Sequence, residues 1–176
     1  DIIKLYSKYA RRVTPELLNA NTYQFSYDEW PTVVREWNNL ELRALRVYQK
    51  LDPRWYDAYE ELVLFPIQAM QNIYEMYYSV AMNAKAESPT EINYWAQRVE
   101  KLYERDSLLC AHYNHEIANG KWDHMMDQVH IGYTSWNNPP KQVMPEVIRI
   151  SPEKFPHTFA EKDGYVSMEA EHYTRA

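Results

Sequence analysis

The chain has 176 residues and a net charge of −6, with 25 acidic residues against 19 lysines and arginines. This length suits one domain, which can bury enough surface to fold without a metal or a disulfide. No basic run marks a nucleic-acid surface, and no apolar run approaches the roughly 20 residues that span a membrane. We therefore expect neither nucleic-acid nor membrane partners, and the single cysteine, Cys110, excludes an internal disulfide framework.

Apolar spacing predicts a short helix within residues 1–12 and a long helix over residues 28–51. Residues at steps of three and four place one apolar stripe on a helix. In the long helix this stripe comprises Trp30, Val33, Trp37, Leu40, Ala44, Val47 and Leu51.

A second long helix is predicted over residues 53–84, because Asp52 can cap it and Pro53 suits its first position. Its stripe comprises Trp55, Tyr59, Leu62, Pro66, Ala69, Ile73, Met76 and Val80. Pro66 lies inside this pattern and removes a helical hydrogen bond, so we expect a kink there while Leu62 and Ala69 stay on the core side.

The third long helix is predicted over residues 89–118, starting at a capping box formed by Ser88 and Glu91. Gly120 is its expected C-cap. Its stripe comprises Ile92, Trp95, Val99, Leu102, Leu109 and Tyr113. Asp106 stands where the next apolar residue of the stripe is due. Three long helices with short connections predict an all-α fold, an antiparallel bundle with one short N-terminal helix.

Three regions follow from these patterns. Residues 1–138 form the helical bundle domain, residues 139–164 a proline-rich, extended linker, and residues 165–176 the start of a truncated β domain. In the last region apolar and polar residues alternate with the period of a strand. We expect this segment to be poorly ordered or to pair with another copy of the chain, because its own sheet is missing.

The motif loop, residues 120–138, concentrates aromatic and polar side chains without a helical period. Such a loop is a binding surface or a seal against another domain, since positioned loops carry much of the function of proteins. Plain packing is the alternative for its aromatic residues. The substrate or interface candidates are Trp122, His124, Gln128, His130, Tyr133 and Trp136.

Metal and catalytic interpretations of the sequence are weak. His124, Asp127 and His130 match no standard zinc spacing, so we expect hydrogen-bonded histidines and neither a metal nor another cofactor. Cys110 would need an activating base to act as a nucleophile, and His112 is not one helical turn away, so it points elsewhere. For Asp106 and Glu75 we expect solvent exposure or pairing, as for most carboxylates on helices. We assign no catalytic residue.

The motif loop is similar to a run in glycoside hydrolase family 115, the xylan α-1,2-glucuronidases. The similarity rests on GKWDHMMDQVHIGYTSW at residues 120–136, followed by two prolines and VMP at residues 143–145. Residues 62–69 and 75–78 also resemble that family, and residues 165–173 resemble the first strand of its C-terminal β-sandwich.

This resemblance implies a helical domain that follows a catalytic barrel and precedes a β-sandwich in a longer enzyme. The implied activity is the inverting removal of glucuronic acid, or its 4-O-methyl ether, from xylan, by two carboxyl groups about 6.5–9.5 Å apart. The implied catalytic carboxylates lie on the barrel, so we expect this chain alone to be inactive. The implied partners are the barrel and the β-sandwich of the parent chain, the implied substrate comes from xylan, and the implied location is periplasmic or extracellular.

Two alternatives to an accessory domain stay open. One is an independent helical module that binds carbohydrate or protein through the aromatic residues of the motif loop. The other is a bundle enzyme in its own right.

Overall fold

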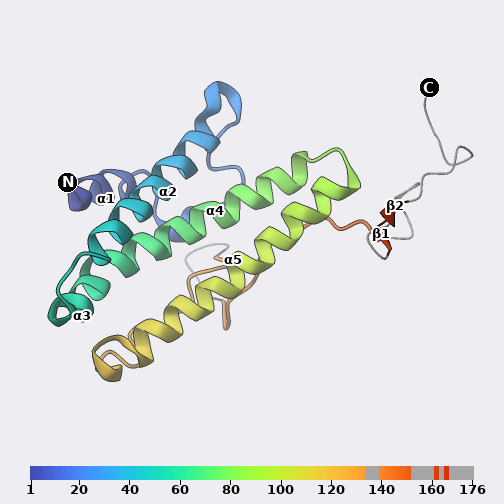
Figure 1. Ribbon diagram of the computed structural model, residues 1–176. Coiled ribbons are helices and arrows are strands. Elements are labelled where there is room, and N and C mark those ends of the chain that lie inside the picture. The colour runs from blue at the N-terminus through green and yellow to red at the C-terminus, as the bar shows by residue number, and fades with distance from the viewer. Residues whose placement is uncertain (134–138, 152–160, 163–164, 167–176) are drawn as a thin grey trace, which may run out of the picture.

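The fold is all-α, as predicted, in the computed structural model, which describes residues 1–133, 139–151, 161–162 and 165–166. The long helices lie side by side, and the short N-terminal helix lies beside the first of them (Figure 1). These helices are α1 (Ile2–Ala10), α2 (Glu29–Tyr48), α4 (Phe65–Lys85) and α5 (Pro89–His115). No helix in these described ranges combines the length and the apolar character needed to cross a membrane.

Short elements connect the long helices. The 3-10 turns are η1 (Pro15–Leu17), η2 (Ser26–Asp28), η3 (Pro53–Trp55) and η5 (Ile117–Gly120). Between α2 and α4 lie η3, the one-turn helix α3 (Tyr56–Tyr59) and a π-helical turn, η4 (Glu60–Leu64). The first turn of this connection is capped as predicted, since the Arg54 N–H donates to Asp52 Oδ1 at 3.1 Å.

Two short strands, β1 (Glu161–Lys162) and β2 (Tyr165–Val166), pair antiparallel within this chain. The expectation that the tail has no partner strand in its own chain is therefore wrong for residues 165–166. Strand β1 supplies a partner, because two adjacent segments can satisfy each other's backbone groups. Residues 167–176, which carry most of that expectation, lie outside the described residues.

The main core lies where α2 faces α4 and α1. Trp37 contacts Tyr6, Tyr9 and Tyr74 through ring pairs with centroids 6.1, 5.6 and 5.3 Å apart. The predicted stripe of α2 is buried from Trp30 to Ala44. It is wrong at Val47, which is 40% exposed because the stripe has left the core one turn before α2 ends.

The predicted second helix is not one continuous α-helix. The π-turn η4 ends at Leu64, and the Phe65 N–H donates to the Glu60 carbonyl one residue further back than in an α-helix. A π-turn rotates everything before it relative to everything after it. As a result Leu62 is 67% exposed and Trp55 is 53% exposed, so the prediction that both lie on the core side is wrong. Tyr59 packs against the core as predicted, and Val63 takes the place of Leu62 there.

Pro66 occupies the first turn of α4, directly after the π-turn. A proline has no N–H to donate and crowds the carbonyl four residues before it. The crowded carbonyl is that of Leu62, which lies inside the π-turn. The hydrogen bonding thus changes just before Pro66, while the kink of the helix axis there stays a prediction.

Helices α4 and α5 form a hairpin that carries the motif loop at its far end (Figure 1). The capping box is confirmed, since the Glu91 N–H donates to Ser88 Oγ at 3.2 Å and that hydroxyl donates to the Glu91 carboxylate at 3.0 Å. Val99 and Leu102 of α5 are buried against Met76 of α4. Val147 and Met144, from the segment after the motif loop, also pack on this cluster.

Residues 143–150 lie against the α4–α5 hairpin, and two asparagines hold them there. Asn83 donates to the Ile148 carbonyl at 3.0 Å and accepts from the Ile148 N–H at 2.7 Å. Asn93 does the same for Ile150, at 2.7 and 2.9 Å. Each amide thus pairs with a peptide group as a neighbouring strand would.

Candidate functional site

The motif loop begins in a left-handed turn. Helix α5 ends at His115, and Ala118, Asn119 and Gly120 all have positive φ. A Cβ on Gly120 would lie 3.2 Å from the His115 carbonyl oxygen, which favours glycine there. The prediction of Gly120 as the C-cap of α5 is wrong, because Glu116 is the cap and Gly120 closes the 3-10 turn that follows.

The far part of the described loop inserts into the fold. Ile131 is fully buried in the cluster of Met76, Val99 and Leu102. Next to it, Gly132 has φ +93°, and a Cβ there would lie 2.6 Å from the Val143 Cβ. The Val143 N–H donates to the Ile131 carbonyl at 3.2 Å. This part of the motif loop is therefore held between α5 and the segment that follows it.

Asn114 near the end of α5 fixes the middle of the loop. Its side-chain amide donates to Asp127 Oδ1 at 2.8 Å, and its carbonyl oxygen accepts from the Met126 N–H at 2.9 Å. Asn114 is buried, so both of its polar ends need partners inside the molecule. The two bonds set where the loop turns back toward α5.

His130 pairs with Asp106 at the centre of this arrangement. Its Nε2 lies 2.9 Å from both carboxylate oxygens of Asp106, which is only 3% exposed. The expectation that Asp106 is solvent-exposed or paired is confirmed in its second form. Its position within the apolar stripe of α5 explains its burial, because the stripe faces the core and the loop brings the counter-charge.

The second ring nitrogen of His130, Nδ1, lies close to one hydrogen-bond acceptor and one hydrogen-bond donor. The Gln128 carbonyl oxygen lies 2.9 Å from Nδ1 and accepts a hydrogen, while the side-chain nitrogen of Gln142 lies 2.9 Å away and donates one. Burial by itself lowers the pKa of His130, but the hydrogen bond and charge of Asp106 outweigh it and raise that pKa above 6.5. A protonated ring, with Nδ1–H donating to Gln128, fits this balance.

A cavity of about 330 Å³ opens beside this pair, between α4, α5 and the motif loop. It is lined on the loop side by Met125, Met126, Gln128, Val129 and His130. The helices contribute Asp106 and Cys110. Burial raises the pKa of the Cys110 thiol to about 12, helped by the charges of Asp106 and Asp127, so the thiol is protonated and not a nucleophile at neutral pH.

His124 lies outside this cavity. Its side chain is 80% exposed, and Nδ1 lies 2.6 Å from the Asp127 carboxylate. Asp123 is close to both His124 and His115, at 3.5 and 3.2 Å. The three groups considered as metal ligands from the sequence therefore separate, since His124 and Asp127 meet at the surface while His130 turns inward.

The remaining candidates divide among different places. Trp122 is half-buried against the cluster of Phe65, Tyr113 and Ile117, and its indole N–H is buried without a described hydrogen-bond partner. Tyr133 is half-buried at the end of the described loop, and Trp136 lies outside the described residues. The structure thus gathers only Gln128 and His130 at one cavity. Whether the loop faces another domain stays a prediction.

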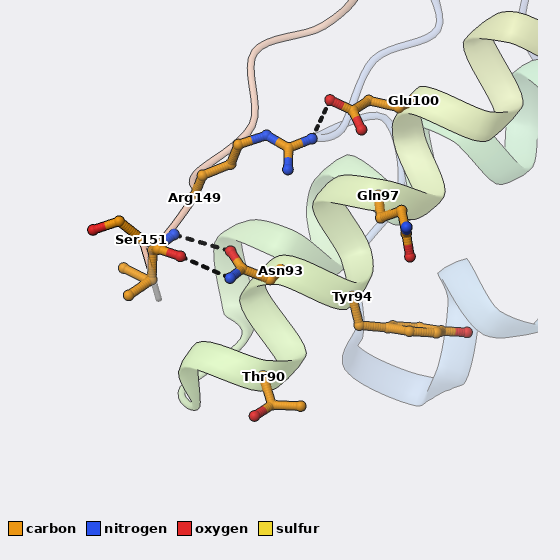
Figure 2. Close-up of a pocket in the computed structure, with 8 residues that line it drawn as sticks. Thr90, Asn93, Tyr94, Gln97, Glu100, Arg149 and Ser151 are labelled. Carbon is orange, nitrogen blue, oxygen red and sulfur yellow. Dashed lines mark hydrogen bonds and ion pairs between the residues drawn. The ribbon is translucent and has the colours of Figure 1, made fainter. Parts of the chain in front are cut away.

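A second hollow lies between the start of α5 and residues 149–151 (Figure 2). Arg149 pairs with Glu100, and Asn93 uses both ends of its amide on Ile150. Figure 2 shows Tyr94 pointing away from Arg149, so the polar side chains do not converge on one point. We interpret this hollow as the seam where the segment meets α5.

A polar network across α2, α4 and α5 was missed from the sequence. Arg105 donates to Glu41 and Gln71, both at 2.6 Å, and Glu75 accepts from Arg98. Gln71 and the nearby Asn72 are buried. Glu75 is paired, as expected, and Glu41 is paired too, because helix packing brings both carboxylates to arginines of α5. The apolar stripe of α4 runs past Gln71, Asn72 and Glu75 without a break, so residue spacing gave no signal of this network.

Comparison with protein-family models and with curated proteins found no match. The chemistry of the site must therefore be judged from its geometry. Asp106, Glu41 and Glu75 are each held by a cationic partner, whereas a glycosidase needs one carboxyl group kept protonated and another ionised across a sugar. Among the described residues this arrangement favours a structural role.

Proposed function

We propose that this chain is an accessory helical domain of a glycoside hydrolase that removes glucuronic acid, or its 4-O-methyl ether, from xylan. It takes no catalytic part by itself. The parent chain supplies a catalytic barrel before it and a β-sandwich after it, and the C-terminal segment 165–176 is the first strand of that sandwich. The parent enzyme acts outside the cytoplasm, in the periplasm or beyond the cell.

The observation that carries this proposal is how the motif loop is used. The loop holds the most specific resemblance to family 115, and its described residues serve the fold of the bundle. Ile131 fills the core, Gly132 permits close contact with Val143, and His130 neutralises the buried Asp106. The motif loop thus resembles the family and at the same time stabilises one end of the helical domain. This combination supports the proposal that the domain is positioned beside a catalytic centre.

The helices also suit a supporting role. Helix α4 packs against both α2 and α5, and the linker segment 143–150 lies along α4 and α5 before the next domain would start. The charged groups between the helices are already paired, which leaves the outer side chains of the motif loop, His124 among them, for contact with the barrel.

A second candidate function is an independent module that binds carbohydrate or protein. Exposed aromatic side chains favour it, because sugar rings pack on aromatic faces that also offer a polar edge. Trp55 and Tyr94 are 53% and 57% exposed, and Arg54 lies over the Trp55 ring at 5.4 Å.

The mass of the natural polypeptide that contains these residues separates the two candidates. An accessory domain requires a product much heavier than 21.2 kDa that includes the barrel sequence. An intact mass near 21.2 kDa, for a protein whose migration is slowed by xylan in an affinity gel, would reject the accessory domain in favour of the independent module.

A further inference from the structure

Three potential metal ligands of different chemistry meet at the cavity below the motif loop. Asp106, Cys110 and His130 each offer one ligand atom, and these atoms all lie within 4.8 Å of one another. Asp106 and Cys110 are four residues apart on α5, which places them on the same face one turn apart. His130 arrives from the loop and completes the triangle.

These atoms fit a tetrahedral zinc-class cation. Zinc binds carboxylate oxygen and imidazole nitrogen at about 2.0–2.2 Å and thiolate sulfur at about 2.3 Å, so its ligand atoms lie roughly 3.3–3.8 Å apart. To bind such a cation, His130 Nε2 and the Asp106 oxygens, now 2.9 Å apart, have to move slightly apart. Cys110 Sγ lies within 4.8 Å of both other ligand atoms and has to move closer to them where its distance exceeds that range. Side-chain rotations of this size need no movement of α5.

The outer side of His130 is already arranged as in metal sites. A ligating histidine usually donates its other ring N–H to a carbonyl or a carboxylate, which fixes the ring and its tautomer. His130 Nδ1 lies 2.9 Å from the Gln128 carbonyl oxygen, and the Gln142 side chain holds the His130 backbone N–H at 3.0 Å. The ring is thus oriented with Nε2 toward Asp106 and Cys110.

We propose that Asp106, Cys110 and His130 bind a zinc-class divalent cation, with the fourth position open to a water molecule from the cavity. On binding, the cation replaces the proton on Cys110 Sγ and the proton on His130 Nε2, and both protons leave to solvent. The carboxylate and the thiolate balance the two positive charges of the cation. This site is independent of the enzyme class proposed above.

Cobalt is the probe for the test, because it follows zinc in its ligands and its bond to a thiolate absorbs in the near ultraviolet. The full 176-residue chain, freed of metals with a chelator, is titrated with Co²⁺ and then with Zn²⁺. We expect one cobalt per chain, a thiolate-to-cobalt absorption band, loss of that band when zinc is added, and release of protons.

Variants identify the ligands. Cys110→Ser keeps the side-chain volume and should abolish the band, while His130→Gln and Asp106→Asn should weaken cobalt binding at least tenfold. Circular dichroism checks that each variant is folded. If His130→Gln and Asp106→Asn do not fold, Cys110→Ser alone still tests the proposal.

The matched controls are His124→Gln and His115→Gln. These exposed histidines lie beside Asp123 and can bind surface metal without any sulfur ligand. Both controls should keep the band at unchanged intensity. Absence of a thiolate–cobalt band in the wild-type chain, or equal cobalt affinity in the wild type and Cys110→Ser, would overturn the proposal.

Discussion

His130 Nε2 lies at the same distance, 2.9 Å, from both carboxylate oxygens of Asp106. This contact joins the motif loop to α5 across 24 residues of sequence. Asp106 is almost fully buried, so the imidazole is what keeps its charge from standing alone in the core. Removing one partner of a buried pair costs more than the pair contributes, because the other is left unpaired.

Substituting His130 by Ala should therefore lower the free energy of unfolding by about 3–5 kcal/mol, the range seen when a buried ion pair loses one member. Chemical denaturation of the chain measures this. The control is His124→Ala, whose exposed pair with Asp127 should contribute little to stability because solvent screens it. Similar losses in both variants would show that the inner pair has no special role.

The same pair predicts how stability depends on pH. The pKa of His130 is raised above 6.5 in the folded chain, chiefly because Asp106 outweighs the effect of burial. A raised histidine pKa contributes stability that is fully present below the unfolded value of 6.5 and is lost as pH rises through the folded pKa. The stability difference between wild type and His130→Gln should therefore shrink as pH rises above 6.5.

The pH dependence has to be measured as that difference. The folded-state pKa values of His112 and His124 are raised as well, so the wild-type curve alone contains their contributions. Subtracting the variant curve leaves the part that depends on His130. A difference that grows with rising pH would contradict the assigned direction of the shift.

Two glycines of the motif loop should tolerate alanine to different degrees. Gly132→Ala combines a left-handed backbone with a Cβ only 2.6 Å from Val143, so we expect a loss of about 2–5 kcal/mol. Gly120→Ala meets only the His115 carbonyl at 3.2 Å, and the backbone strain alone should cost about 1–2 kcal/mol. Denaturant midpoints of the two variants give the order, and a reversed order would exclude the close contact at Val143.

Trp122 tests whether the loop aromatics serve packing. Its ring lies on the cluster of Phe65 and Tyr113, so Trp122→Ala should lower stability by about 3 kcal/mol. Trp55→Ala, at an exposed aromatic, should change it by less than about 0.5 kcal/mol. An unchanged melting temperature for Trp122→Ala in the parent polypeptide, together with weaker xylan binding, would instead assign this ring to sugar contact.

The sequence was a good guide to the helices and a poor one to the site. Apolar spacing, the Ser88 cap and the Asp52–Pro53 boundary located α2, α4 and α5 because these features are local. The π-turn before Pro66 was not predictable from spacing, since the hydrogen-bond pattern that rotates Leu62 outward leaves no apolar signature.

The pair of Asp106 and His130 shows why the rest could not be found. The position of Asp106 in the apolar stripe of α5 left solvent exposure and pairing both open, and its partner depends on how the motif loop folds back. That path is set by Asn114, Gly132 and Ile131 acting over long sequence separations. The burial of Gln71 and Asn72 on α4 was unpredictable for the same reason, because it depends on α4 packing against both α2 and α5.

We propose that this domain supports a glucuronidase without catalysing the reaction. The direct measurement compares glucuronate release from aldouronic acids by the natural polypeptide and by the isolated 176-residue chain. We predict release by the former and none by the latter, because inversion needs two carboxyl groups and a positioned water around one sugar. Turnover by the isolated chain that disappears in Asp123→Ala or Asp127→Ala, or no release by the natural polypeptide, would contradict the account.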